Sequence, residues 1–415
     1  MKRVVVTGIG AVTPLGNSAE EFWKNAVNGM PGAAPITRFN AEKFKTRFAC
    51  EVKNFDPLNW LDKAEVRKND LFAQFALASV SEAFVNAKVD LEKINKYRVG
   101  VIWGSGNGGM QTFEDQVSEF ALGDGTPRFS PYFIPKMIVN IASGVISIKY
   151  GLKGMNYTTI SACATGNTAL MDAFNYIRWG KVDMVVSGGS EAPVTSASIG
   201  GFGAMKALST NNDNFQTASR PFDVSRDGFV MGEGSGAIIL ESYEHAMERG
   251  APILAELAGA AMTADAYHLS ATHPEGEGAA RAIILALEDS GLQPTDIQYI
   301  NTHSTSTPLG DLSEVKAMET VFGSTPNHLS ISGTKSMTGH LLGAAGAIEA
   351  ILCIEAIRHG EVPPTINTKE LDPAIPVGFD IVLGKSKKKP IKAAMSNAFG
   401  FGGHNSTVIF REFVA

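Results

Sequence analysis

The chain has 415 residues, of which 44% are hydrophobic and 19% are charged, and its formal net charge is −6. This length exceeds the usual size of one hydrophobic core, so we expect two domains or a duplicated one. The composition excludes a disordered protein, and the net charge disfavours a nucleic-acid-binding one. No apolar run reaches transmembrane length, and the three separated cysteines form neither a disulfide framework nor a Cys-x-x-Cys metal motif. Without a signal peptide, a reducing cytoplasm is the expected location.

Two glycine-rich segments in the first third of the chain resemble nucleotide-binding loops. In the segment that begins Val4-Val-Val-Thr-Gly8-Ile-Gly10, the third glycine position holds Thr13. Gly104-Ser-Gly-Asn-Gly-Gly109 matches G-x-G-x-x-G after a strand predicted over residues 98–103. A lone match is weak, no Walker loop is present, and tight turns between buried helices and a sheet explain both segments. We therefore predict no nucleotide site.

Cys163 is the most informative residue of the first half. It follows a β-branched run that begins at Tyr157 and predicts a strand, and it precedes an apolar helix predicted from about residue 164 to 179. A helix N-terminus lowers the pKa of a thiol from its usual value of about 8.5, which favours the nucleophilic thiolate. A small buried hydrophobe is the alternative role for any cysteine. The placement at a strand-to-helix turn favours a nucleophile.

The chain contains a weak internal duplication. The predicted helices Gly166–Gly180 and Gly346–Gly360 both begin with Gly, end in Ile-Arg-x-Gly and continue to Val at the same spacing. A strand lies upstream of each, at residues 98–103 and 297–301, and alternating strands and helices indicate α/β halves with parallel sheets. We predict an N-terminal half at 1–250 and a C-terminal half at 251–415. In this register Cys163 faces Gly343, so both helix starts meet at a central site.

The second half carries the other reactive groups. His303 lies in a hydroxyl-rich loop directly after the strand at 297–301, where α/β proteins bind ligands. His340 precedes the second buried helix in a loop of small residues that also contains Lys335. The glycines around Phe401 suit a flexible loop that faces a substrate. Each has a plainer alternative, because a lone His is more often structural, Lys335 could be a surface charge and Phe401 could be core.

These motifs resemble the elongating β-ketoacyl-acyl carrier protein synthases, and most closely their type II members. The resemblance covers essentially the whole chain, and it rests on the segment around Cys163 and on four further motifs. These are Arg220-Pro-Phe-Asp223, His303-x-Thr-Ser-Thr-Pro-x-Gly-Asp311, Lys335-Ser-Met-Thr-Gly-His340 and Gly400-Phe-Gly-Gly403. The family implies a thiolase-like fold of two duplicated α/β halves in α-β-α-β-α layers, and a homodimer.

The resemblance also implies a reaction, the decarboxylative Claisen condensation of malonyl-acyl carrier protein with an acyl chain held on Cys163. The backbone N–H groups of Cys163 and Phe401 would form the oxyanion hole. His303 and His340 would stabilise the enolate as neutral imidazoles, and His303 would also activate water or assist decarboxylation. Lys335 would help to keep His303 neutral, and Phe401 would move as a gate when Cys163 is acylated.

Binding residues are likewise implied by the family. Thr305 and Thr307 would bind the phosphopantetheine arm, which arrives on the carrier protein, so that no cofactor or metal of the protein's own is expected. Asn107 and Phe399 would contact the substrate. The acidic carrier protein would dock on a basic patch. The matching positions, for each of which a solvated charge is the alternative, are Lys63, Arg67, Lys68, Arg128 and Lys206.

The chain departs from the family pattern at three places, and the departure at Asn107 leaves its chain-length preference open. Ser304 replaces a glycine, Asn107 stands where the family often has an apolar residue or Gly, and His404 replaces a threonine. A specialised synthase of a polyketide or polyene pathway is one alternative. A non-catalytic subunit of the chain-length-factor kind is disfavoured because such subunits lack the nucleophile, which is present here as Cys163. A zinc hydrolase is disfavoured because no further metal-ligand spacing is present. A thiolase would need a second reactive Cys, and a starter-unit synthase would have Cys-His-Asn in place of one Cys and two His.

Overall fold

The computed structural model describes residues 1–415. The strands are β1 (Val4–Val12), β2 (Ala34–Pro35), β3 (Phe48–Ala49), β4 (Val99–Gly104), β5 (Asn156–Thr159), β6 (Met184–Glu191), β7 (Gly234–Ser242), β8 (Ala255–Ala264), β9 (Tyr299–Asn301), β10 (Ser330–Ser332), β11 (Glu361–Val362), β12 (Asp380–Ile381), β13 (Lys387–Lys388), β14 (Ala393–Gly400) and β15 (His404–Arg411). The α-helices are α1 (Ala19–Val27), α2 (Lys63–Lys68), α3 (Leu71–Asn86), α4 (Met110–Leu122), α5 (Phe133–Met137), α6 (Ile141–Tyr150), α7 (Thr165–Arg178), α8 (Ser196–Ala204), α9 (Tyr243–Glu248), α10 (Glu277–Ser290), α11 (Pro308–Phe322), α12 (Lys335–Thr338) and α13 (Ala345–His359). The 3₁₀ turns are η1 (Pro57–Asn59), η2 (Lys96–Arg98), η3 (Ala162–Ala164), η4 (Asn212–Thr217), η5 (Pro294–Asp296) and η6 (Leu342–Ala344).

The predicted duplication is confirmed in the strand order. Eleven strands form one sheet, and outward from its centre the first half runs β1-β7-β6-β4-β5 while the second runs β8-β15-β14-β9-β10. In both halves the first two pairings are antiparallel and the outer two are parallel. β1 and β8 pair in the middle, and β12 extends the sheet beyond β10. The segment between α9 and β8 contains the predicted boundary at residue 250.

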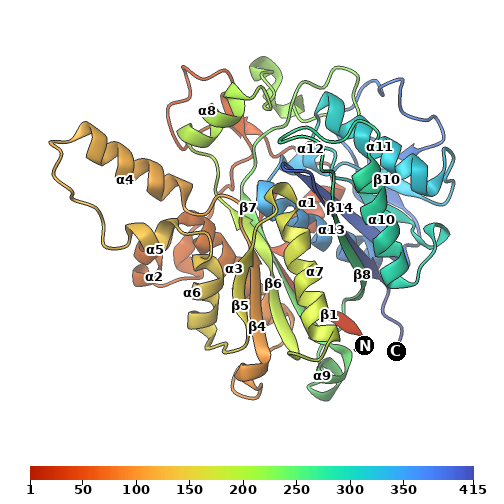
Figure 1. Cartoon of the computed structure of the whole chain (residues 1–415), viewed down its shortest axis with the longest axis horizontal. Helices are drawn as coiled ribbons and strands as arrows, with labels where there is room; N and C mark the ends of the chain where they lie inside the picture. The colour runs from red at the N-terminus through yellow and green to blue at the C-terminus, as the bar shows by residue number, and fades with distance from the viewer.

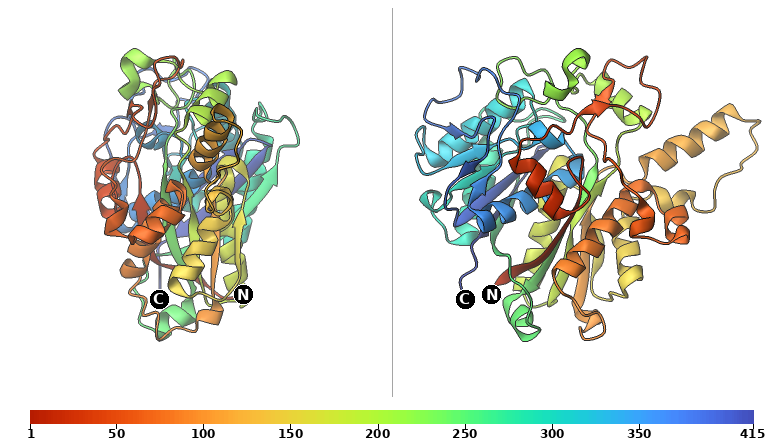
Figure 2. Two further views of the ribbon diagram at one scale, coloured as in Figure 1. Left: turned by 90° about the vertical axis from the view of Figure 1, so that its left-hand side faces the viewer. Right: turned by 180° about the vertical axis from the view of Figure 1, so that it is seen from behind.

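Helices cover the two half-sheets in layers. α3 packs on the outer face of the first half, α10 packs on the outer face of the second, and α7 and α13 lie between the halves in contact with strands of both. The two central helices are buried on most sides, as the sequence predicts. This is the expected α-β-α-β-α arrangement. Figures 1 and 2 show α4 projecting from this body as an arm, with both termini at the end of the molecule opposite α8.

The central helices begin in the same way in both halves. η3 precedes α7 and η6 precedes α13, and the first residue of each turn has a positive φ, +50° at Ala162 and +49° at Leu342. Cys163 and Gly343 are the middle residues of these turns, which pack against each other. The predicted meeting of the two helix starts is therefore confirmed. No helix of the protein combines the length and the apolar character needed to cross a bilayer.

Candidate active site

The thiol of Cys163 lies at the carboxyl edge of the first half-sheet. The Thr165 hydroxyl donates to the Ala162 carbonyl (2.6 Å) and accepts from the Ser161 N–H (2.8 Å), which holds the turn between β5 and α7. Cys163 is 8% exposed and belongs to an apolar cluster that includes Phe229 and Leu342. The Cys163 side chain is therefore buried among apolar side chains rather than on the surface.

Burial has a larger effect on the pKa of the Cys163 thiol than the start of the helix has. It raises the pKa of Cys163 to about 12, against the lowering effects of the Lys335 charge and of the backbone N–H groups of Phe401 and Cys163. The expectation of a lowered pKa is therefore wrong for the resting enzyme, because desolvation disfavours the thiolate. Both N–H groups lie close enough to the sulfur to lower the pKa of the thiol.

The loop between β14 and β15 brings Phe401 to the cysteine. A Cβ atom on Gly400 would lie 2.6 Å from the Ser161 carbonyl oxygen and 2.9 Å from the Cys163 nitrogen, so only glycine permits this approach. Gly402 and Gly403 have φ of +85° and +75°, which complete the tight turn. The Phe401 ring is half-buried, with its centroid 6.3 Å from that of Phe202.

The two predicted histidines come together from different elements of the second half. The His303 and His340 rings are nearly perpendicular (87°), with centroids 5.3 Å apart. His303 follows β9, and its ring lies 5.7 Å from that of Phe399. Hydrogen bonds of its backbone N–H and carbonyl groups hold His340 in place. Its ring lies 5.3 Å from that of Phe229, which also packs in the Cys163 cluster. Aromatic rings thus enclose the pair.

Both imidazoles are held neutral. Burial and the Lys335 charge shift the pKa of His303 and of His340 well below the ordinary value, and His340 lowers that of His303 further. The Nδ1 atoms of both rings are buried without a hydrogen-bond partner. Neutral imidazoles in an enclosed site can donate N–H hydrogen bonds to an oxygen that gains negative charge.

Lys335 is a buried charge and not a surface one. Its ammonium pairs with the carboxylate of Glu349 on α13, and each side chain is 1% exposed. Burial raises the pKa of Glu349 to about 7, with Lys335 acting in the opposite direction. The ion pair with Glu349 fixes Lys335 close enough to the thiol and both histidines to shift their pKa values.

Two further carboxylates support the site and were not predicted. Glu314 on α11 accepts from the N–H groups of His303 (2.9 Å) and Ser304 (2.8 Å). Glu191, at the end of β6, accepts from the N–H groups of Gly106 and Asn107 and is fully buried, which raises its pKa to about 7. Glu314 lies one helical turn after Asp311, the last residue of the His303–Asp311 motif. This spacing could have suggested Glu314 as a further residue of the site. A carboxylate at Gly106 also disfavours a phosphate in the loop 104–109.

The predicted binding residues are divided between the site and the surface. The Thr305 and Thr307 hydroxyls lie 3.1 Å apart in the loop after His303. Asn107 turns its amide toward Glu191 (3.4 Å). Of the expected docking residues, three lie on α2, one lies in the arm after α4 and one follows α8, and all are exposed: Lys63, Arg67, Lys68, Arg128 and Lys206. Figure 1 shows α2 beside α5 and well away from α8, so one chain does not gather all five.

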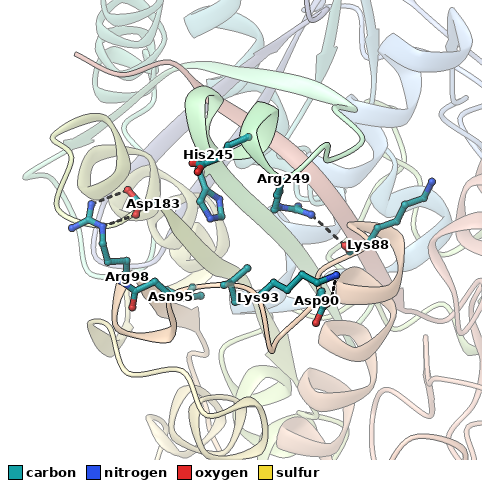
Figure 3. Close-up of a pocket in the computed structure, with 11 residues that line it drawn as sticks. Lys88, Asp90, Lys93, Asn95, Arg98, Asp183, His245 and Arg249 are labelled. Carbon is teal, nitrogen blue, oxygen red and sulfur yellow. Dashed lines mark hydrogen bonds and ion pairs between the residues drawn. The ribbon is translucent and has the colours of Figure 1, made fainter.

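A cavity of about 680 Å³ lies far from this site, at the amino ends of β4 and β6 (Figure 3). Its arginines are already engaged, Arg98 by Asp183 and Arg249 by Glu241. We assign it no ligand.

Comparison with known proteins agrees with this geometry. Residues 1–246 match the family described as "Beta-ketoacyl synthase, N-terminal domain", and residues 254–369 match "Beta-ketoacyl synthase, C-terminal domain". The chain is 47% identical over 414 residues to "3-oxoacyl-[acyl-carrier-protein] synthase 2" of Staphylococcus aureus (strain COL), covering 100% of this chain and 99% of that one. The protein of the same name from Synechocystis is 47% identical over 99% of this chain and 98% of its own.

Solved structures give the same result. A β-ketoacyl synthase from Burkholderia phymatum STM815 superposes with a TM-score of 0.92 at 34% identity, and the ishigamide ketosynthase/chain length factor with 0.93 at 32%, each over 100% of both chains. The resemblance read from the sequence is confirmed over its full length. The chain belongs to the β-ketoacyl synthase family of condensing acyltransferases.

Proposed function

We propose that this protein extends acyl chains by two carbons in fatty-acid synthesis, with Cys163 as the nucleophile that carries the chain. Its sulfur attacks the thioester carbonyl of an acyl-carrier protein, the bond from that carbonyl to the carrier's sulfur breaks, and the carrier thiol leaves with the proton lost by Cys163. The Cys163 and Phe401 N–H groups stabilise the oxyanion. Support comes from the position of both N–H groups next to the thiol, since the carbonyl that Cys163 attacks must also lie beside this sulfur.

The second half-reaction needs the histidines. Malonyl-carrier protein loses carbon dioxide, and the electron pair of the broken C–C bond remains as an enolate whose oxygen accepts hydrogen bonds from His303 and His340. The enolate carbon attacks the acyl-Cys163 carbonyl, the bond from that carbonyl to Sγ breaks, and the thiolate takes up a proton. The observation that carries this proposal is the pair of buried imidazoles, whose pKa values lie well below the ordinary value. The pair packs on Phe229, which belongs to the same apolar cluster as Cys163.

The carrier protein enters the proposal as a partner, and its phosphopantetheine arm as part of the substrate, so that the protein needs no cofactor of its own. Thr305 and Thr307 hydrogen-bond the arm, Phe401 gates the pocket, and Phe399 and Asn107 line it. The three cations on α2 attract the acidic carrier, whereas Lys206, which follows α8, lies away from them. Charge reversal at Arg67 should then raise the KM for carrier-bound substrates and leave acylation by small thioesters unchanged.

A homodimer and a cytoplasmic location complete the proposal. β5 is an edge strand with unpaired backbone groups, and Ile160 beside it is 58% exposed. The projecting arm exposes further apolar side chains, including Phe113 and Phe120. A second copy of the chain would cover these surfaces, and Ile160→Glu should shift the sedimentation coefficient toward the monomer. The three free, buried cysteines suit a reducing compartment.

The test is the intact mass of the protein after incubation with acyl-carrier protein. Wild type and Cys353→Ala, which removes a buried thiol elsewhere, should gain one acyl group, whereas Cys163→Ala should gain none. His303→Asn and His340→Asn should still be acylated but should release little 3-oxoacyl product from malonyl-carrier protein. Acylation of Cys163→Ala would disprove the covalent assignment.

A further inference from the structure

The loop that carries Thr305 and Thr307 is held in an uncommon backbone conformation. Ser306, between the two threonines, has a φ of +68°, a left-handed conformation that is unfavourable for residues other than glycine. The carboxylate of Asp311, which is fully buried, accepts from the N–H groups of Ser306 (3.1 Å) and Thr307 (3.3 Å). The spacing of the threonine hydroxyls therefore depends on what keeps this turn in place.

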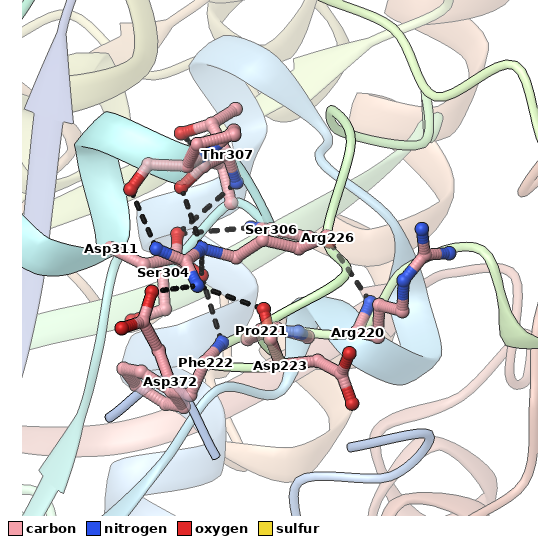
Figure 4. Close-up of polar contacts among 12 residues, drawn as sticks. Arg220, Pro221, Phe222, Asp223, Arg226, Ser304, Ser306, Thr307, Asp311 and Asp372 are labelled. Carbon is pink, nitrogen blue, oxygen red and sulfur yellow. Dashed lines mark hydrogen bonds and ion pairs between the residues drawn. The ribbon is translucent and has the colours of Figure 1, made fainter. Parts of the chain in front are cut away.

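A second segment, residues 220–228, encloses the same loop from the other side (Figure 4). The Arg220 N–H donates to the Ser306 hydroxyl (3.0 Å), and the Gly228 N–H donates to the Ser306 carbonyl (3.1 Å). The Phe222 N–H donates to Asp311 (2.9 Å). The Arg-Pro-Phe-Asp motif thus contacts the loop through its backbone, which explains a sequence pattern that the reaction itself does not use.

Arg226 is the side chain that joins these parts. Its guanidinium is 2% exposed and donates to the carbonyls of Thr307 (3.0 Å) and Pro308 (2.6 Å). It also donates to the Asp372 carboxylate (2.9 Å) and lies 3.4 Å from Asp311. A planar guanidinium with donors in fixed directions can hold two successive carbonyls and two carboxylates at once, which a lysine cannot do.

We propose that Arg226 is a positioning residue that presets the Thr305–Thr307 hydroxyl pair for the phosphopantetheine arm, acting through the Thr307 and Pro308 carbonyls and Asp311. This inference rests on the proposed function, in which these hydroxyls bind the arm. A preset pair binds the arm without first ordering the loop. Loss of Arg226 should therefore weaken binding of carrier-bound substrates and leave the thiol chemistry unchanged.

Arg249 supplies a matched control, because it is also an arginine that pairs with a buried carboxylate. It contacts Glu241 and the Ala87 carbonyl, at the end of the molecule opposite the site. Arg226→Gln and Arg249→Gln should both lower stability. Only Arg226→Gln should reduce kcat/KM for carrier-bound substrates, by about tenfold and mainly through KM, since about one hydrogen bond's worth of binding is lost. Arg226→Lys should recover only part of the lost kcat/KM.

Two readouts separate positioning from a general structural effect. The rate of Cys163 alkylation by iodoacetamide, and its acylation by a thioester of a short alkyl thiol that lacks the arm, should match wild type in Arg226→Gln. An equal loss with armed and armless thioesters would overturn the inference. If Arg226→Gln does not fold, Asp372→Asn removes one partner of the guanidinium and should shift KM in the same direction, and an unchanged KM would count against the inference.

Coupling to the threonines distinguishes this inference from the proposed function. If Arg226 acts through the hydroxyls, the effect of Arg226→Gln on KM should nearly vanish in a Thr305→Val/Thr307→Val background. Full additivity would overturn the inference while leaving the function intact. If the double valine variant itself binds carrier-bound substrates like wild type, the assignment of the arm to these hydroxyls fails instead.

Discussion

Lys335 and Glu349 form an ion pair that excludes water almost completely, since each side chain is 1% exposed. The two residues are 14 positions apart, on α12 and α13. A buried cation is costly unless a carboxylate pairs with it, and Glu349 supplies that carboxylate to the Lys335 ammonium. That charge in turn lowers the pKa of Cys163, His303 and His340 together.

Replacement of Lys335 by methionine should therefore change the pH dependence of the reaction. Without the positive charge, the pKa of each histidine rises, so the acidic limb of the condensation rate should move to higher pH. The pKa of Cys163 rises as well, so alkylation by iodoacetamide at a fixed pH should slow. Rate–pH profiles and alkylation rates measure both effects.

Glu349→Gln is the comparison, because it keeps the lysine and removes its partner. Each variant should lose about 3–5 kcal/mol of stability, as expected when one member of a buried pair is removed. Only Lys335→Met should move the acidic limb upward. An acidic limb at the wild-type position in Lys335→Met would show that the ammonium does not control the imidazoles.

Asn107 should influence which acyl chains are accepted. Its backbone and side-chain N–H groups face Glu191, so a polar group stands in the proposed acyl pocket. Asn107→Leu adds apolar contacts worth about 0.8 kcal/mol per buried CH₂, which should favour longer chains. The kcat/KM ratio between a long and a short saturated acyl-carrier protein measures this. The same proportional change for both chain lengths would mean that the side chain does not touch the acyl group.

The duplicated halves were readable from the sequence because the central helices repeat a pattern of buried residues and glycines. The positions of Cys163, His303 and His340 followed from strand ends and from motifs. The networks around them were not readable, because their partners are distant in the chain, as Arg226 and Thr307 are. The pKa of Cys163 was mispredicted for a related reason, since local sequence indicates a helix start but not the degree of burial. Residues 220–223 contributed only to the family resemblance until their contacts with the loop after β9 were known.

The shared glycines of the central helices should be intolerant of substitution. A Cβ atom on Gly346 would lie 2.5 Å from the Asn167 Oδ1 atom and 2.8 Å from its backbone nitrogen, and one on Gly166 would lie 2.6 Å from the Ala347 nitrogen. Gly346→Ala should cost about 1–3 kcal/mol through overpacking and should lower activity, because η3 and η6 lie at the start of these helices. Gly144→Ala on α6, where no atom lies within 4 Å, should be neutral or stabilising. Chemical denaturation measures the stability of both variants. Equal stabilities of Gly346→Ala and Gly144→Ala would contradict close packing of the central helices.

Glu82 should make stability depend on pH far from the active site. Its carboxylate on α3 accepts from the N–H groups of Ala11 and Ala19 (2.8 Å each), and burial raises its pKa to about 7 from an ordinary value of 4.5. Because the folded-state pKa is the higher one, the folded protein binds the proton more tightly. The favourable contribution is complete below about pH 4.5 and is lost as the pH rises to about 7, amounting to about 3 kcal/mol. The unfolding free energy of wild type minus that of Glu82→Gln should therefore fall as the pH rises across this range. Glu92→Gln, at an exposed site, should show no such difference, and a flat difference for Glu82→Gln would mean that the carboxyl group ionises in the folded protein as readily as in water.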